Sequence, residues 1–123
     1  MMMRWLAVGA GGFVGAIARY GASLVVARFW SGDFPLATFL INVSGSFVLG
    51  LFSTLAGERL SISPTWRLFF ATGLVGAYTT FSTFEYETQR LTEQAAYWWA
   101  ALNLVASVSV GFAAVRLGVA LAR

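Results

Sequence analysis

The chain alternates between four long apolar stretches and three short polar breaks. The apolar stretches run from Trp5 to Phe29, Phe34 to Gly57, Leu68 to Phe84 and Gln94 to Val115. A helix needs about 20 predominantly apolar residues to cross a bilayer core, within a usual range of about 17 to 25. The pattern therefore predicts four membrane-spanning helices, at roughly 4–29, 34–57, 65–88 and 94–120. The breaks at 31–33, 58–64 and 89–93 leave room only for short connections.

Composition supports a membrane protein with one all-α domain over residues 1–123. Hydrophobic residues make up 59% of the chain and charged residues 11%, whereas about 25% of a typical soluble domain is charged. The five tryptophans lie at or near the expected helix ends: Trp5, Trp30, Trp66, Trp98 and Trp99. Tryptophan gathers at membrane interfaces in this way. We expect an integral protein of the cell (inner) membrane, with the lipid bilayer as its solvent.

Several classes of function are disfavoured by the residue types. The chain has no Cys, His or Lys, which removes thiolate metal sites and the commonest catalytic base. Glu85 and Glu87 are close carboxylates, but no nucleophile or metal cluster accompanies them, so we do not expect an enzyme. The net charge is +3. Its arginines lie mostly near helix ends, which indicates membrane-flank anchoring rather than nucleic-acid binding.

The glycine-rich N-terminal segment allows two other interpretations. A signal peptide is disfavoured, because no obvious cleavage site and soluble mature domain follow it. Residues 8–15 also come close to a dinucleotide-binding fingerprint, but that motif needs a βαβ unit, and only membrane-length helices follow. Gly11 and Gly15 instead form a small-xxx-small pair, which lets two membrane helices approach closely.

Polar side chains form stripes on two of the predicted helices. Thr38, Asn42 and Ser46 are spaced four residues apart on the second, and Asn103, Ser107 and Gly111 repeat the spacing on the fourth. Each stripe occupies one helical face and must face protein or water, since lipid offers no hydrogen bonds. Hydrogen bonding between helices is one explanation. The carboxamide of Asn42 makes a polar pathway comparably plausible, and Thr38 and Ser107 are candidates for the same pathway.

Residues Gly73 to Phe84 place two glycines and four hydroxyls in an otherwise apolar span. That composition suggests backbone and side chains put to use at membrane depth. Phe81 and Phe84 are three residues apart and share a face. The edges of their rings carry positive potential, so they can contact a bare anion without holding it too tightly, as conduction requires.

Arg19 lies well inside the first predicted helix, where a permanent charge is a functional-site hypothesis. Two explanations stay open. The side chain serves a vestibule of the pathway, or it is structural and either snorkels to an interface or pairs with Glu85 or Glu87.

These segments together resemble the CrcB/Fluc family of fluoride channels over nearly the whole chain. The resemblance rests on Gly-Gly-x-x-Gly-Ala with Arg19, on Pro-x-x-Thr-x-x-x-Asn ending at Asn42, and on Thr-Thr-Phe-Ser-Thr-Phe ending at Phe84. It implies a broken third helix and an antiparallel, dual-topology homodimer with two pores, each lined by both subunits. The arginine count alone instead predicts one orientation, with a cytoplasmic N-terminus.

The resemblance also implies roles for individual residues. Asn42, Phe81 and Phe84 match the pore residues, and Ser82 and Thr83 match their polar lining. The main-chain carbonyls of Gly76 and Thr79 match ligands of a structural Na⁺ at the dimer centre, which suits a hard cation. The chain departs from the family pattern at Ala77, Tyr78, Glu85 and Asn103.

The function that the resemblance implies is passive export of F⁻ from the cytoplasm, which lowers fluoride toxicity. Two rivals remain. A small dual-topology multidrug exporter has a similar size, but proton-coupled exporters of that kind need a carboxylate deep in the first helix, where this chain has Arg19. A non-transporting membrane assembly subunit would account for the glycine-rich packing alone.

Overall fold

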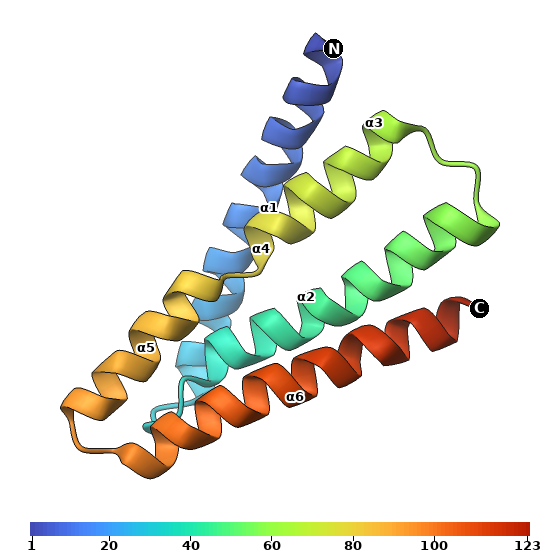
Figure 1. The fold of residues 1–123 in the computed structure, drawn as a ribbon. Coiled ribbons are helices and arrows are strands. Elements are labelled where there is room, and N and C mark those ends of the chain that lie inside the picture. Colours follow the sequence, from blue (N-terminus) through green and yellow to red (C-terminus); the bar gives the residue numbers. More distant parts are fainter.

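The computed structural model describes all residues, 1–123, and consists of helices with no strands (Figure 1). The helices are α1 (Met2–Phe29), α2 (Leu36–Thr54) with its π-helical extension η1 (Leu55–Arg59), α3 (Pro64–Arg67), the π-helical η2 (Leu68–Val75), α4 (Gly76–Tyr78), α5 (Phe81–Glu93) and α6 (Tyr97–Ala122). The predicted all-α class is confirmed.

Three helices are long and apolar enough to cross a membrane: Met2–Phe29, Leu36–Arg59 and Tyr97–Ala122. The region between the second and third of these is not one continuous helix. It runs as α3, η2 and α4, leaves helical geometry at Thr79 and Thr80, and resumes as α5. Figure 1 shows the chain bending at this point. The protein is a multi-pass membrane protein with an interrupted helix in its second half.

The largest differences from the expected ranges lie on either side of the turn before α6. The helix expected to end near residue 88 continues to Glu93, and α6 begins at Tyr97 rather than at 94. Ala95 takes a left-handed backbone conformation, with φ 57°. That conformation ends a helix, so the turn occupies residues 94–96.

Main-chain contact at glycines holds the helices together. A side chain at Gly11 or Gly15 would collide with the carbonyl oxygen of Phe69 or Leu74, in η2. At Gly73, in η2, an added Cβ would lie 2.7 Å from the carbonyl oxygen of Val8. The predicted close packing at Gly11 and Gly15 is confirmed. The dinucleotide fingerprint is excluded, because residues 8–15 lie inside a helix and no strand exists.

A second glycine contact joins α2 to α6, which run side by side in the same direction (Figure 1). A Cβ at Gly50 would lie 2.5 Å from the Val115 carbonyl oxygen, and one at Gly118 would collide with that of Phe47. Where the two helices end, Arg123 forms a salt bridge with Glu58 at 3.0 Å. Both side chains are exposed, so this ion pair adds little stability.

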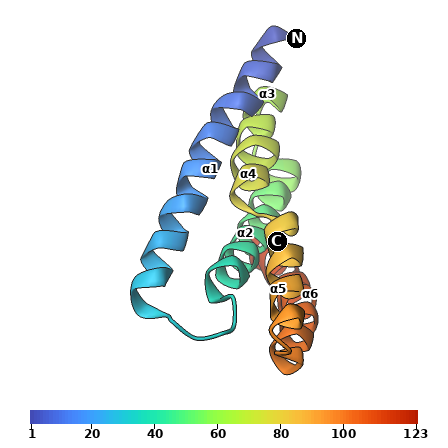
Figure 2. The same ribbon diagram turned by 90° about the vertical axis from the view of Figure 1, so that its left-hand side faces the viewer.

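Few side chains are buried inside the single chain. Only 18 of its 123 residues are buried, and large apolar side chains are exposed along α1 and α6. Figure 2 shows α1 lying along the α3–α4 segment and diverging from α5. Such a surface is stable in contact with lipid or with another protein chain, because neither contact exposes apolar side chains to water.

Candidate functional site

The interruption between α4 and α5 is held by the side chain of Asn42, on α2. Its Nδ2 donates to the Thr80 carbonyl oxygen at 3.0 Å, and the Thr80 amide donates to its Oδ1 at 2.7 Å. Thr80 lies outside any helix, so its two main-chain groups would otherwise be unpaired at membrane depth. One carboxamide therefore satisfies both main-chain groups of the residue at the break.

Thr80 also begins the next helix. Its Oγ1 accepts a hydrogen bond from the Thr83 amide at 3.3 Å and donates to the Thr83 hydroxyl at 3.0 Å. This is N-capping, which satisfies an amide that has no helical partner. The cap fixes where α5 starts, and Phe81 and Phe84 therefore occupy its first turn.

The two phenylalanines lie against each other at the break. Their ring centroids are 5.8 Å apart and their planes are tilted by 59°. Phe84 is 5% exposed, whereas Phe81 is 74% exposed. One ring is thus fixed by packing inside the chain, and the other stands at its surface.

A hollow of about 260 Å³ opens where α2, α5 and α6 meet the break, and we call it the polar hollow. Its lining comes from Asn42, Gly45, Ser46, Leu49, Val75, Thr79, Thr80, Phe81, Phe84, Ser107 and Val108. Four of the predicted pore residues meet here: Asn42, Phe81, Phe84 and Ser107. Polar groups that converge in an otherwise apolar hollow are typical of a small-ligand site.

The other predicted pore residues lie outside the lining. Thr38 is buried one turn before Asn42 on α2, and the Thr83 hydroxyl is engaged with Thr80. Ser82 is exposed on α5. The structure does not bring these three side chains into the polar hollow.

Arg19 is half-buried and donates from Nε to the Ala77 carbonyl oxygen at 3.1 Å. Ala77 is in α4, at the end of the helix that starts at Pro64, where the helix dipole places partial negative charge. The expected alternative of an ion pair with Glu85 or Glu87 is wrong. Glu87 instead has a buried Oε1 without a hydrogen-bond partner. A charge on α1 thus supports the C-terminal end of the first half of the interrupted helix.

The break also releases main-chain carbonyls. In a continuous helix the Gly76 and Thr79 carbonyls would accept from the amides of Thr80 and Thr83. Those amides donate to Asn42 and to the Thr80 hydroxyl instead. Both carbonyl oxygens are therefore without their helical donors, and such oxygens suit a hard cation.

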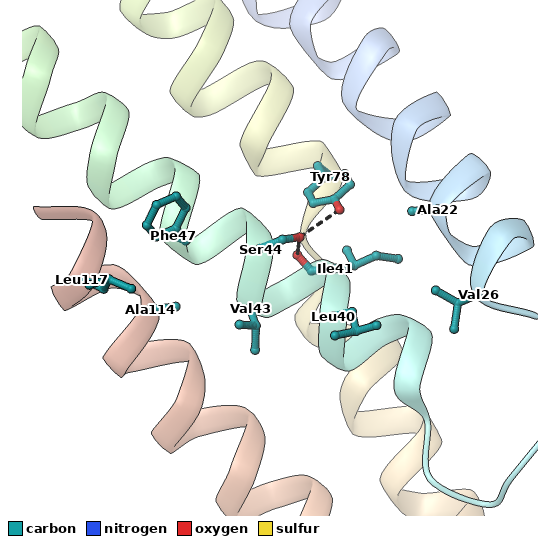
Figure 3. Close-up of a pocket in the computed structure, with 10 residues that line it drawn as sticks. All are labelled: Ala22, Val26, Leu40, Ile41, Val43, Ser44, Phe47, Tyr78, Ala114 and Leu117. Atoms are coloured by element: carbon teal, nitrogen blue, oxygen red, sulfur yellow. Dashed lines mark hydrogen bonds between the residues drawn. The ribbon is translucent and has the colours of Figure 1, made fainter. Parts of the chain in front are cut away.

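A larger hollow, of about 420 Å³, lies between α1, α2, α4 and α6 (Figure 3). Nine of its ten lining residues are hydrophobic. Figure 3 shows two hydrogen bonds in this lining: one between the hydroxyls of Ser44 and Tyr78, at 3.0 Å, and one from the Ser44 hydroxyl to the Ile41 carbonyl oxygen, at 3.1 Å. Two hydroxyls that are already paired in an apolar lining cannot replace the hydration shell of an ion, so the polar hollow is the stronger candidate despite its smaller size.

Sequence reasoning missed three residues of the site. Thr80 carries a visible signal, since threonine is a favoured N-cap residue immediately before a helix. Gly45 leaves room for the Thr79 methyl group, which would have to move if residue 45 carried a side chain. Thr88 binds the side chain of Asn103, and no local pattern joins residues on two different helices.

We predict that Asn42→Leu destabilises the protein by about 1–3 kcal/mol, the usual cost of leaving buried polar groups unpaired. Leucine fills a similar volume but offers neither hydrogen bond to Thr80. The measurement is the unfolding free energy of purified protein in detergent.

Ser46→Ala is the matched control. Ser46 lies one turn further along α2 and lines the same hollow, but its hydroxyl takes no part in the pairing with Thr80. We expect its unfolding free energy to stay within about 0.5 kcal/mol of the unmodified protein. Equal stability of the Asn42→Leu variant and this control would contradict the role given to Asn42.

Comparison with known proteins shows the family of the chain. The model of the family described as CrcB-like protein, Camphor Resistance (CrcB), matches residues 6–119. A protein of Solibacter usitatus named fluoride-specific ion channel FluC is 41% identical over 98% of this chain and 99% of its own length. One of Streptomyces avermitilis, named fluoride-specific ion channel FluC 1, is 48% identical over 95% of this chain and 94% of its own. The chain belongs to the CrcB/FluC family.

Proposed function

We propose that this protein is a fluoride-selective channel that lets F⁻ leave the cytoplasm passively, and that it is not an enzyme. The observation that carries the proposal is the polar hollow, where the Asn42 carboxamide meets Phe81 and Phe84 at a helix break. The names of the similar proteins in Solibacter usitatus and Streptomyces avermitilis support the same ion.

The chemistry of the hollow suits a small anion. A carboxamide nitrogen has two hydrogens, and Asn42 donates one to the Thr80 carbonyl oxygen. The other hydrogen is left for an anion. The ring edges of Phe81 and Phe84 add weak positive potential. No fixed cation lines the hollow, so an anion can enter it and also leave, as conduction requires.

The membrane potential supplies the direction of transport. The inside of the cell is electrically negative. Moving one elementary charge across the membrane changes the free energy by about 2.3 kcal/mol per 100 mV of membrane potential. An anion inside the cell therefore moves outward through an open pathway without ATP. Passive flow along this potential is sufficient for fluoride export.

A single chain does not enclose this pathway, and a second copy would complete it. Phe81 lines the polar hollow yet is 74% exposed. A copy inserted in the opposite orientation would cover this ring and much of the exposed apolar surface. We therefore propose an antiparallel homodimer with dual topology in the inner membrane, consistent with the resemblance to the fluoride-channel family.

We further propose that Na⁺ is held at the dimer centre by the carbonyl oxygens of Gly76 and Thr79. Both lack their helical donors, and carbonyl oxygen is a suitable ligand for a hard cation. When bound, the ion would supply positive charge that stabilises the released carbonyl oxygens at the break. Arg19 fits a supporting role at the same break, through Ala77.

The test of fluoride selectivity is efflux from liposomes that contain the purified protein. We expect fluoride efflux to exceed chloride efflux at least about tenfold, a difference of about 1.4 kcal/mol in barrier. Phe81→Ile and Phe84→Ile should each reduce the fluoride flux, because isoleucine has no ring edge.

Phe13→Ile is the matched control, since Phe13 is exposed on α1 and does not line the hollow. It should conduct like the unmodified protein. Equal flux of the two halides would contradict selectivity, and unchanged fluoride flux in both ring variants would contradict the role of the rings.

Dual topology is tested with single cysteines, which the cysteine-free chain permits directly. Ser61→Cys and Gln94→Cys introduce exposed thiols in the connections at opposite ends of α3–α5. In intact cells, a membrane-impermeant maleimide should label about half of each variant if subunits insert in both directions. Complete labelling of one variant and none of the other would show a single orientation.

Sodium binding is tested by stability. A ligand that binds only the folded state stabilises it by about 2.7 kcal/mol at a hundredfold excess over its Kd. We expect the unfolding temperature to fall when Na⁺ is replaced by N-methylglucamine at equal ionic strength, and to recover on adding Na⁺ back. An unfolding temperature that does not depend on Na⁺ would overturn this site.

A further inference from the structure

The most buried polar side chain of the protein belongs to Asn103, on α6, which is 1% exposed. Its Nδ2 donates to the Thr88 hydroxyl at 2.9 Å, and its Oδ1 accepts from the Ser107 hydroxyl at 3.1 Å. Thr88, also buried, donates in turn to the Phe84 carbonyl oxygen at 2.9 Å. We call this series, from Ser107 through Asn103 to Thr88, the donor chain.

The donor chain reaches the polar hollow directly at Ser107 and, at its Thr88 end, through Phe84. Ser107 lines the hollow from α6, and Phe84, which receives the last hydrogen bond, lines it from α5. Asn103 itself lies behind this lining, out of reach of an ion. It is therefore placed to act on the hollow through its two neighbours.

The direction of the donor chain decides what Ser107 offers to an anion. As the structure has it, the single hydroxyl hydrogen of Ser107 goes to Asn103. Only the oxygen lone pairs of Ser107 then face the hollow, and lone pairs repel an anion. In this state Ser107 cannot act as a ligand for fluoride.

The donor chain can run in the opposite direction with all three members still paired. Both hydroxyls and the carboxamide can donate and accept. After rotation of the carboxamide, Thr88 would donate to Asn103, and Asn103 would donate to Ser107. The hydrogen of Ser107 is then free for the hollow.

We propose that Asn103 is a positioning residue whose carboxamide, by reversing the donor chain, turns Ser107 from an acceptor into a hydrogen-bond donor for an anion in the polar hollow. This inference rests on the proposed function. The reversal gives up one hydrogen bond, from Thr88 to the Phe84 carbonyl. It gains a bond to an anion, and such charge-assisted hydrogen bonds are roughly twice as strong as neutral ones.

The first test is NMR of protein labelled with ¹⁵N-asparagine. Asn42 and Asn103 are the only asparagines, so each side-chain amide is a separate reporter in one spectrum. Asn42 reports an anion in the hollow, and Asn103 reports the direction of the donor chain. We expect both amide signals to shift as sodium fluoride replaces sodium gluconate.

Ser107→Ala should abolish the fluoride-dependent shift of the Asn103 signal and keep that of the Asn42 signal. Ser107→Thr restores a hydroxyl and should therefore recover the shift at Asn103. A merely structural Asn103 would not respond to the anion through Ser107. If Asn42 shifts and Asn103 does not, the inference fails while the proposed function stands. If neither amide responds, an anion does not occupy the hollow, and both fail.

The second test is a pair of substitutions measured by fluoride efflux. Measured at a pH where it is ionised, the carboxylate of Asn103→Asp cannot donate, so it would hold the Ser107 hydrogen permanently. We expect Ser107→Ala to lower the flux at least threefold in the unmodified protein but to have no further effect in the Asn103→Asp background.

The added negative charge of Asn103→Asp lowers anion flux by itself, and the pair of substitutions separates that effect. If charge alone acted, Ser107→Ala would lower the flux by the same factor in both backgrounds, and the inference would be overturned. The NMR test on the unmodified side chain holds even if Asn103→Asp fails to fold.

Discussion

Two hydrogen bonds between Asn42 and the main chain of Thr80 are the interaction on which the rest of the structure depends. A helix that stops at membrane depth exposes donors and acceptors that lipid cannot satisfy. Because Asn42 pairs both groups, the chain can stop one helix at Tyr78 and start another at Phe81. The ring pair, the released carbonyls and the polar hollow all follow from that interruption.

The remaining helices hold Asn42 and Thr80 at the right separation. Glycine contacts bring α1 against η2 and α2 against α6 at main-chain distance. At the break itself, the Thr79 methyl group packs directly against α2 at Gly45. Arg19 adds a hydrogen bond to Ala77, next to the break. The rigid frame and the irregular site are therefore parts of one arrangement, in which regular helices support a short non-helical stretch.

The sequence predicts the frame better than the site. Long apolar stretches, tryptophans at their ends and the Gly11 and Gly15 pair indicate helices and their packing, because these signals are local. The partner of Asn42 is 38 residues away, and the pairing of Arg19 with a carbonyl rather than with Glu85 or Glu87 depends on how α1 crosses α4. Periodicity identifies the polar stripes, but only the fold shows that Ser107 reaches the hollow while Thr38 does not.

The most direct test of the account is amide hydrogen exchange at Thr80, measured by NMR on protein in lipid bilayers. Thr80 belongs to no helix, yet its amide hydrogen is bound to Asn42. The account predicts that this amide exchanges as slowly as those inside α5. Exchange at Thr80 as fast as in the exposed connection between η1 and α3 would contradict it, since the break would then have no partner.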